Sequence, residues 1–416
     1  MSDGSLTCWS EESEGGLEEE DLDYPDYDSD LEEDFYDDYE DEEMDEDDFE
    51  DEIPRQSPLS WAVQNNHADI VRLLLSREDI QPDLPNSEGQ TPLFLACNSG
   101  NEEVVGMLLE RGVAIDPNFR EPWHTFSPLT VAASNSHEGV VKLLLTRNDI
   151  DPNIHSHDGL TALSIAASGG CEGVVKLLLA WGPIDLNSTD PLYGRRALGH
   201  AACNGHKGVV ELLLACEGAE PNHIDVNGQT ALTIAVERRY LDVVRALLDH
   251  EDTEPNHIDV NGQTALTIAA ERGYTDIVRV LLDREDTDPS LRDVWGRSPL
   301  CYAICRGWEG IVKALVARPD LDLNEAPVGD GPTALSLAVG SGDDEVVRIL
   351  LERDDVDVNL TDTCGRSPLW HAMGSGDEAI TKMLVARGGI KTGPEFGDEG
   401  RSVPVLPANY NCGRVG

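Results

Sequence analysis

The sequence predicts an all-α protein, an elongated α-solenoid of about ten stacked helix-turn-helix repeats with protruding loops, preceded by a disordered acidic tail. A block of the form Ser/Thr-Pro/Ala-Leu-x-x-Ala recurs at steps of 34 to 36 residues. The first 52 residues hold 28 of the 81 acidic residues and no Lys or Arg. A unit this short cannot bury its apolar faces alone, so neighbouring units are expected to stack.

The acidic tail, residues 1–53, has too many charges and too few aliphatic side chains to bury a core, which predicts disorder. It also contains seven of the 22 aromatic residues in the chain. Two interpretations stay open. The tail is either a solvated segment that keeps the chain in solution or a segment that docks on basic or apolar surfaces. Docking includes an intramolecular contact of residues 1–52 with the repeat region.

Each block in the repeat region, residues 54–389, is expected to begin a first helix. An opening Ser or Thr can cap a helix N-terminus, and the Pro that follows in five blocks has a preset helical φ. Leu stands two residues after the opening position and Ala three residues further on, so both lie on one helical face. The ten blocks open at Ser57, Thr91, Ser127, Thr161, Arg196, Thr230, Thr264, Ser298, Thr333 and Ser367.

A second apolar stripe follows each first helix, as in residues 140–145 with the sequence VVKLLL, and predicts a second helix. The link between the two is short, which favours an antiparallel pair. After the second helix come turn-forming residues, as in Arg147–Asn153 and in the Asp-x-x-Gly of Asp225–Gly228, which predict a protruding loop. Two blocks, Glu220–Ala235 and Glu254–Ala269, are identical over sixteen residues, which indicates that a unit was duplicated.

These residues resemble the ankyrin repeat, whose signature is Asp-x-x-Gly-x-Thr-Pro-Leu-His-x-Ala followed by a Val-Val-x-x-Leu-Leu helix. The resemblance covers roughly residues 54–390, and the loops of the form Arg-x-Asp-x-Asp-Pro-Asn are similar to those of large ankyrin arrays of filamentous fungi. The usual His after Thr-Pro-Leu is replaced in every block, for example by Ser60, Phe94 and Gly199. Hydrogen bonding at the helix start is therefore expected to differ from the family pattern.

The C-terminal segment, residues 390–416, begins like an eleventh unit but does not continue as one. Residues 397–402 imitate the lead-in to a block, and Pro404 and Pro407 then prevent a helix. This pattern predicts an irregular segment and a truncated eleventh repeat. The segment either lies across the open end of the array as a cap or meets a partner there.

Charge and composition exclude several classes of function. With 30 basic against 81 acidic residues, nucleic-acid binding is disfavoured. There is no secretory signal and no long apolar run, which predicts an intracellular protein, cytoplasmic or nuclear, without a membrane span. Nine scattered cysteines fit a reducing compartment. The motifs of nucleotide-binding, zinc-protease and hydrolase sites are lacking, so we expect no enzyme, no cofactor and no metal.

By resemblance, ankyrin arrays bind proteins through their loop tips and the exposed ends of their first helices, which line a concave groove. Aromatic residues and arginines at such positions are typical energetic anchors of interfaces. The candidate protein-binding residues are Trp123, His124, Phe126, Tyr193, Arg195, Glu237, Arg238, Glu271, Arg272, Trp295, Arg297 and Arg306.

The function that these observations favour is a non-catalytic scaffold or adaptor that binds a partner protein through the concave groove. The alternative is a regulator that acts through the acidic aromatic tail, either on basic partner proteins or as an autoinhibitory segment. Deleting residues 1–52 distinguishes the two, because a scaffold retains its partners and a tail-dependent regulator loses them.

Overall fold

The fold is all-helical throughout the described residues of the computed structural model, which are 56–122, 125–182, 184–325, 332–362 and 365–390. These residues belong to one contact unit, Pro54–Gly416. They form twenty α-helices and one short 3₁₀ helix, η2 (Gly112–Ala114). The predicted all-α repeat fold is confirmed. The predicted tail, residues 1–53, and residues 391–416 of the predicted C-terminal segment lie outside the described residues.

The helices form ten pairs, which we number units 1 to 10 in chain order. The first helices are α1 (Pro58–Gln64), α3 (Pro92–Ser99), α5 (Pro128–Ser134), α7 (Ala162–Ser168), α9 (Ala197–Cys203), α11 (Ala231–Glu237), α13 (Ala265–Glu271), α15 (Pro299–Arg306), α17 (Ala334–Ser341) and α19 (Pro368–Ser375). The second helices are α2 (Ala68–Leu75), α4 (Glu102–Leu109), α6 (Glu138–Leu144), α8 (Glu172–Trp181), α10 (Lys207–Leu214), α12 (Leu241–Leu248), α14 (Thr275–Leu282), α16 (Glu309–Val316), α18 (Asp344–Leu351) and α20 (Glu378–Arg387).

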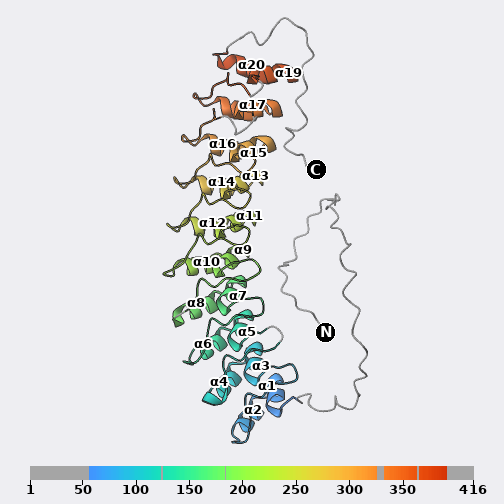
Figure 1. Ribbon diagram of the computed structural model, residues 1–416, viewed down its shortest axis with the longest axis vertical. Coiled ribbons are helices and arrows are strands. Elements are labelled where there is room, and N and C mark those ends of the chain that lie inside the picture. Colours follow the sequence, from blue (N-terminus) through green and yellow to red (C-terminus); the bar gives the residue numbers. More distant parts are fainter. Residues whose placement is uncertain (1–55, 123–124, 183, 326–331, 363–364, 391–416) are drawn as a thin grey trace, which may run out of the picture. The chain divides into compact units, whose positions relative to one another are not determined.

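The pairs stack on one another, as predicted for repeats that share a core. Every first helix contacts the second helix of its own unit and the first helix of the next unit, and every second helix contacts the next second helix. Figure 1 shows the two sets as two columns, with the loops projecting from them. The main contacts of the described helices therefore run within a unit and between neighbouring units, which is the arrangement of a solenoid.

The fixed Leu and Ala positions of the blocks form the shared core. The ten Ala residues of the blocks, from Ala62 to Ala372, are completely buried. The Leu residues of the blocks are buried as well, with the exception of Leu198 in unit 5, which is partly buried. Small side chains at the helix contacts allow close approach of the backbones, and the Leu side chains fill the space between units.

The opening hydroxyls cap the first helices in nine of the ten units. Thr91 Oγ1, for example, accepts a hydrogen bond from the backbone N–H of Phe94 at 3.2 Å. Helix α9 has no side-chain cap because Arg196 stands at that position. The residue that replaces the family His often pairs with the cap, as Thr267 does with Thr264 at 2.9 Å between the two hydroxyl oxygens.

The turn between the two helices of a unit requires a residue with positive φ. Glycine occupies this position in most units, for example Gly205 with a φ of 79°. Asn66, Ser136 and Arg239 adopt the same left-handed conformation with φ values of 59°, 58° and 61°. Left-handed backbone costs a residue with a Cβ atom more than it costs glycine.

The Arg-x-Asp motif after the second helix connects adjacent units. Arg318 Nε and Nη2 lie 2.8 and 2.7 Å from the two carboxylate oxygens of Asp320. Arg318 Nη1 donates to the carbonyl oxygens of Leu282 (3.0 Å) and Arg284 (3.1 Å) in the preceding unit. The hydrogen bond from Arg318 lowers the pKa of Asp320. Arginine thus supplies the C-terminal carbonyls of one helix with the donors that they lack.

The Asn of the loop motif forms a second link between units. Asn256 Nδ2 donates to the carbonyl of Asp286 at 2.6 Å, and its Oδ1 accepts from the backbone N–H of Asp288 at 2.8 Å. Asn118, Asn222 and Asn324 make the same pair of bonds in other units. The repeated loop sequence is therefore structural, and it keeps successive loops in register.

Candidate protein-binding surface

In units 6 to 8 the hairpin turn of the loop is built around the Asp of the Asp-x-x-Gly motif. In unit 6, Asp225 Oδ1 accepts hydrogen bonds from the backbone N–H groups of Asn227 (2.8 Å) and Gln229 (2.9 Å). Gly228, with a φ of 70°, closes the turn by donating to the Asp225 carbonyl at 2.9 Å. Asp225 is buried by these contacts, whereas Val226, which follows it, is 61% exposed at the tip.

Backbone hydrogen bonds hold the hairpin tips of units 5 to 8 side by side. They run from Val226 N–H to the Tyr193 carbonyl (2.8 Å), from Val260 N–H to the Asn227 carbonyl (3.4 Å) and from Val294 N–H to the Asn261 carbonyl (3.1 Å). The tips approach so closely that a Cβ atom on Gly262 would lie 2.9 Å from the Val294 nitrogen. The four hairpins therefore have fixed positions relative to one another.

Two histidines at equivalent positions strengthen this arrangement. His223 Nε2 lies 2.8 Å from the Gly194 carbonyl, and His257 Nε2 lies 2.9 Å from the Gly228 carbonyl. Because a carbonyl oxygen only accepts, each imidazole donates to the hairpin of the preceding unit. The sequence predicts these histidines to be surface residues and not ligands, and both are partly buried in these contacts between units.

The tips of units 5 to 8 present apolar side chains to solvent. We call these side chains the hairpin row, and they are Leu192, Tyr193, Val226, Val260, Val294 and Trp295, between 44% and 69% exposed. The corresponding tips of units 2 and 4 expose polar residues instead, Ser87 and Glu88 in one and His157 and Asp158 in the other. Contiguous exposed apolar side chains are typical of interaction surfaces.

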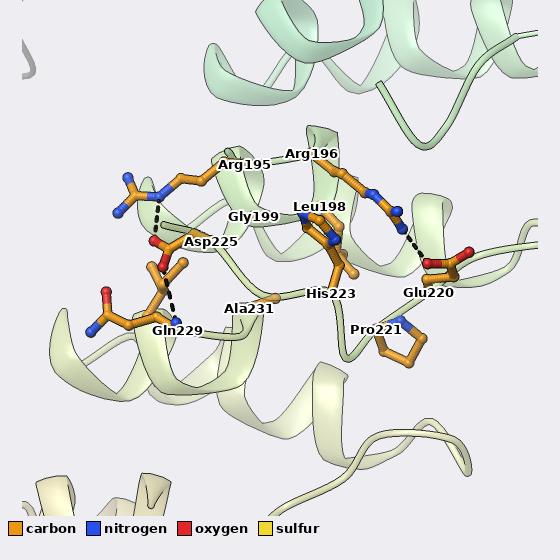
Figure 2. A pocket seen from close by; sticks show the side chains of 11 residues that line it. Arg195, Arg196, Leu198, Gly199, Glu220, Pro221, His223, Asp225, Gln229 and Ala231 are labelled. Atoms are coloured by element: carbon orange, nitrogen blue, oxygen red, sulfur yellow. Dashed lines mark hydrogen bonds and ion pairs between the residues drawn. The ribbon is translucent and has the colours of Figure 1, made fainter. Parts of the chain in front are cut away.

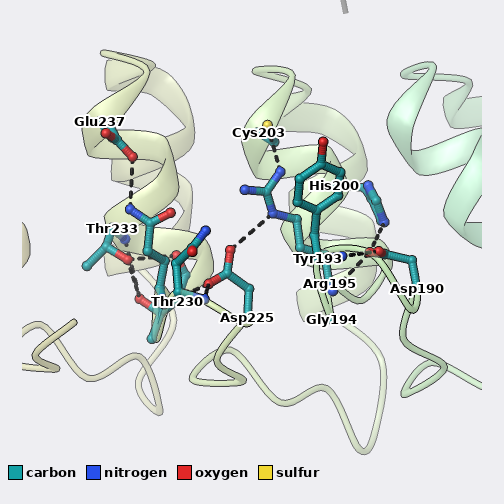
Figure 3. A network of polar contacts seen from close by, with 12 residues as sticks. Asp190, Tyr193, Gly194, Arg195, His200, Cys203, Asp225, Thr230, Thr233 and Glu237 are labelled. Atoms are coloured by element: carbon teal, nitrogen blue, oxygen red, sulfur yellow. Dashed lines mark hydrogen bonds and ion pairs between the residues drawn. The ribbon is translucent and has the colours of Figure 1, made fainter. Parts of the chain in front are cut away.

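At one end of the row, Tyr193 and Arg195 lie together. The Arg195 guanidinium carbon is 4.8 Å from the centre of the Tyr193 ring. Its Nε is 3.2 Å from Asp225 Oδ2, and its Nη1 is 3.4 Å from the sulfur of Cys203 (Figure 3). The Arg195 side chain is only 13% exposed, so it supports the aromatic ring and carries a neutralised charge.

At the other end, Trp295 and Arg297 repeat this arrangement. The Arg297 guanidinium carbon lies 4.6 Å from the Trp295 ring and 4.5 Å from the Tyr302 ring. Asp293, whose side chain is fully buried, accepts from Arg297 Nε (3.1 Å) and from the Tyr302 hydroxyl (2.6 Å). Burial and this hydrogen bond raise the pKa of Tyr302.

The remaining candidates of units 6 to 8 lie at the C-terminal ends of the first helices α11, α13 and α15. Glu237 accepts from Arg272 Nη2 of the next unit at 2.8 Å, and Glu271 accepts from Gln263 Nε2 at 2.8 Å. Arg238 and Arg306 are exposed, and neither makes an ion pair with any described residue. Of the five candidate arginines, Arg195, Arg272 and Arg297 are therefore paired with carboxylates of the chain itself.

The sequence matches the family model for ankyrin repeats over overlapping segments that together span residues 40–395. The chain belongs to the ankyrin repeat family. Among curated proteins, similar segments occur in human Rabankyrin-5 (39% identical over 74 residues, 18% of this chain and 6% of that protein) and in alpha-latrotoxin-Lhe1a of Latrodectus hesperus (34% over 92 residues, 19% of this chain and 5% of that protein). This chain therefore matches less than a tenth of the length of either relative.

Among solved structures, the ankyrin repeat domain of Bcl-3 is similar, with a TM-score of 0.49 and 28% identity over 55% of this chain and 99% of that one. Ankyrin repeats are protein-interaction domains and are generally not catalytic. Of the ankyrin helices in the described residues, none is both long enough and apolar enough to cross a membrane.

Of the three candidates in ankyrin unit 3, only Phe126 lies within the described residues, and Trp123 and His124 lie outside them. Phe126 is partly buried and packs against the core, and its backbone carbonyl accepts from the Glu121 N–H at 3.1 Å. Phe126 thus anchors its loop to the ankyrin core.

A shallow depression lies between ankyrin units 5 and 6, where Gly199 and the partly buried Leu198 leave space (Figure 2). Arg196 pairs with Glu220 across it, and His223, which also lines it, is bound to the neighbouring hairpin. One atom, Arg196 Nε, is buried without a hydrogen-bond partner. In the described part of the chain no three His, Cys, Asp or Glu side chains cluster as a metal site would require.

Sequence reasoning missed the residues that hold the turn Asp from the first helix. His200 Nε2 lies 3.1 Å from Asp190 Oδ2, and His371 Nε2 lies 3.0 Å from Asp362 Oδ2. Burial lowers the pKa of both histidines, although the carboxylates act in the opposite direction. The sequence signal for these histidines is a polar residue one position after the place of the usual ankyrin His, and Tyr302 stands at the same position in unit 8. The apolar tip residues Leu192, Val226, Val260 and Val294 were not predicted either, and their sequence signal is an apolar residue one or two positions after the turn Asp.

Proposed function

We propose that this ankyrin repeat protein is a non-catalytic scaffold that binds a partner protein through the hairpin tips and first-helix ends of units 5 to 8. The observation that carries the proposal is the hairpin row, in which six large apolar side chains are exposed on hairpins that are hydrogen-bonded into one rigid edge. A pre-organised apolar surface binds a partner without the entropy cost of ordering loops. The aromatic residues at its two ends are typical interface anchors.

The charges around the row fit a partner protein whose surface combines apolar side chains with some carboxylates. Arg195, Arg272 and Arg297 are compensated within the chain, and Arg238 and Arg306 remain for carboxylates of a partner. The proposal also states that the protein is intracellular, that it binds neither nucleic acids nor membranes, and that it catalyses no reaction.

A photo-crosslinking experiment on the full chain tests the proposal. We would place p-benzoylphenylalanine at Tyr193 or at Trp295 and, as a control, at Leu73, which is 69% exposed on helix α2 of unit 1. In the source cell, adducts to another protein are expected from the first two positions and not from the third. Deleting residues 1–52 should leave these adducts in place. Equal labelling from all three positions, or loss of the adducts with the tail, would contradict the proposed site.

A further inference from the structure

The hairpin row has the same order of hairpin types when it is followed in either direction. Unit 5 presents Leu192-Tyr193-Gly194-Arg195, and unit 8 presents Val294-Trp295-Gly296-Arg297, so each is an aliphatic residue, an aromatic residue, Gly and Arg. In both, the guanidinium carbon lies less than 5 Å from the aromatic ring of the same hairpin. Along the row, the two end hairpins (units 5 and 8) each carry an aromatic residue, and the two central hairpins (units 6 and 7) lie between them.

The two central hairpins are identical. Unit 6 presents residues 226–229 and unit 7 presents residues 260–263, both with the sequence VNGQ, within the identical blocks Glu220–Ala235 and Glu254–Ala269. Each also exposes an Ile directly before the turn Asp, Ile224 at 48% and Ile258 at 54%. The central part of the surface is therefore two copies of one patch, which exposes Ile and Val together with one Asn in each copy, Asn227 and Asn261.

A surface with this order of hairpins can pair with a second copy of itself about a twofold axis. A twofold axis pairs positions at equal distances on either side, so an isologous interface requires a patch that is self-complementary when reversed. With the axis between units 6 and 7, the hairpin of unit 6 contacts the hairpin of unit 7 in the second chain. The hairpin of unit 5 likewise contacts the hairpin of unit 8 in the second chain. The polar tip of unit 4, His157 and Asp158, lies beyond the contact.

We propose that the hairpin row binds a second copy of this chain, antiparallel, about a twofold axis between units 6 and 7. Val226 then contacts the partner's Val260, and Tyr193 contacts the partner's Trp295. The proposal rests on the proposed function, since the same hairpin tips bind protein, and it specifies that a second copy binds there.

The size and charge of the surface fit a dimer. The six side chains of the row and the two isoleucines offer on the order of 100 Å² each, which approaches the ~800 Å² per partner of a standard interface. The two arginines that stack on the aromatic rings of the row are already paired within each chain, Arg195 with Asp225 and Arg297 with Asp293. The aromatic hairpins therefore bring no arginine without a carboxylate partner into the contact, a burial that would oppose association.

Analytical ultracentrifugation of the full chain tests the dimer. The wild type is expected to sediment as a concentration-dependent dimer. The double variant Val226→Asp/Val260→Asp is expected to raise the dimer dissociation constant at least about 100-fold, because four carboxylates then enter the apolar contact. The control Val385→Asp, at a residue that is 57% exposed on α20 and outside the row, should leave the constant unchanged. Circular dichroism melting curves establish that all three chains fold.

Cysteine pairing tests the orientation. A chain with Val226→Cys mixed with a chain with Val260→Cys should form a disulfide-linked dimer on mild oxidation, while either chain alone gives only the background of the wild type with its native cysteines. A wild-type chain that stays monomeric at about 50 μM, a dimer that the Asp variant does not weaken, or crosslinks above the wild-type background within either single-variant sample would overturn the proposal.

The failure of this inference and the failure of the proposed function are distinguishable. A monomeric chain that still forms adducts with another protein from Tyr193 and Trp295 contradicts only the dimer. A dimer whose adducts from these positions are exclusively with its own sequence supports the dimer and contradicts a separate partner at this surface.

Discussion

Replacing the buried Asp293 by Ala should destabilise unit 8 much more than the matching change in unit 7. Asp293 accepts hydrogen bonds from the backbone N–H groups of Trp295 (2.9 Å) and Arg297 (2.8 Å), from Arg297 Nε and from the Tyr302 hydroxyl. The Tyr302 side chain is buried, so its hydroxyl cannot turn to water. An unsatisfied buried donor costs about 1–3 kcal/mol, and an accessible one costs less.

The matched control is Asp259→Ala in unit 7. Asp259 accepts from the backbone N–H groups of Asn261 and Gln263, both at 2.8 Å, and the residue at the position of Tyr302 is Ile268, which has no hydroxyl. We therefore expect Asp259→Ala to lower the free energy of unfolding by about 1–2 kcal/mol and the Asp293 variant to lower it by about 3–4 kcal/mol.

A double-mutant cycle with Tyr302→Phe isolates the decisive contact. Removing the hydroxyl alone should cost about 1 kcal/mol, whereas in the Asp293→Ala background it should restore about 1 kcal/mol, because it removes the orphaned donor. Equilibrium urea unfolding gives these values, and amide hydrogen exchange shows whether the loss is confined to unit 8 and its neighbours. Equal costs for the two Asp variants, or no coupling with Tyr302→Phe, would refute the reasoning.

Three further predictions concern stability. Ser136→Gly should raise the free energy of unfolding by about 0.5–1 kcal/mol, because φ there is 58°. Gly170→Ser at the equivalent turn should lower the free energy of unfolding by more than this, because the new Cβ would also meet the ring of His206. Urea unfolding midpoints measure both effects. Burial lowers the folded-state pKa of His371, so its contribution is complete above pH 6.5 and is lost as the pH falls towards that lowered value. Between pH 7.5 and 5.5 the wild type should lose more stability than His371→Gln. Arg318→Lys should cost about 1–2 kcal/mol by thermal unfolding, because an ammonium cannot serve both the carboxylate and the carbonyls of the preceding unit.

Local chemistry made the helices predictable from the sequence. The caps, such as Thr91, act on backbone groups three residues away, and the Leu and Ala positions follow the helical period, so both are visible in one short block. The hairpin row was not predictable in the same way. Val226 and Val260 stand 34 residues apart, and only the stacking register and the hydrogen bonds between tips place them on one edge.

The pairing of the arginines was hidden for a related reason. Arg195 meets Asp225 thirty residues later, and Arg272 meets Glu237 thirty-five residues earlier, so the carboxylate partners lie one unit away along the stack. Counting basic residues at loop tips therefore overstates the positive charge of this surface. A contact of the acidic tail, residues 1–52, with these arginines stays a prediction, and Arg238 and Arg306 are the two that are not already paired with a carboxylate of the described residues.

Duplication of one unit offers a direct route to a self-complementary surface. A twofold axis through the row requires two matching central hairpins, and the identical blocks around Val226 and Val260 supply both at once. The outer hairpins need only match in kind, as the Tyr193 and Trp295 hairpins do. If one central Val is changed to Asp, the carboxylate enters the symmetric contact twice, so each single variant should weaken the dimer and the pair should weaken it further. A heterologous partner would instead meet each hairpin once, and the two single variants would then differ according to what each one contacts.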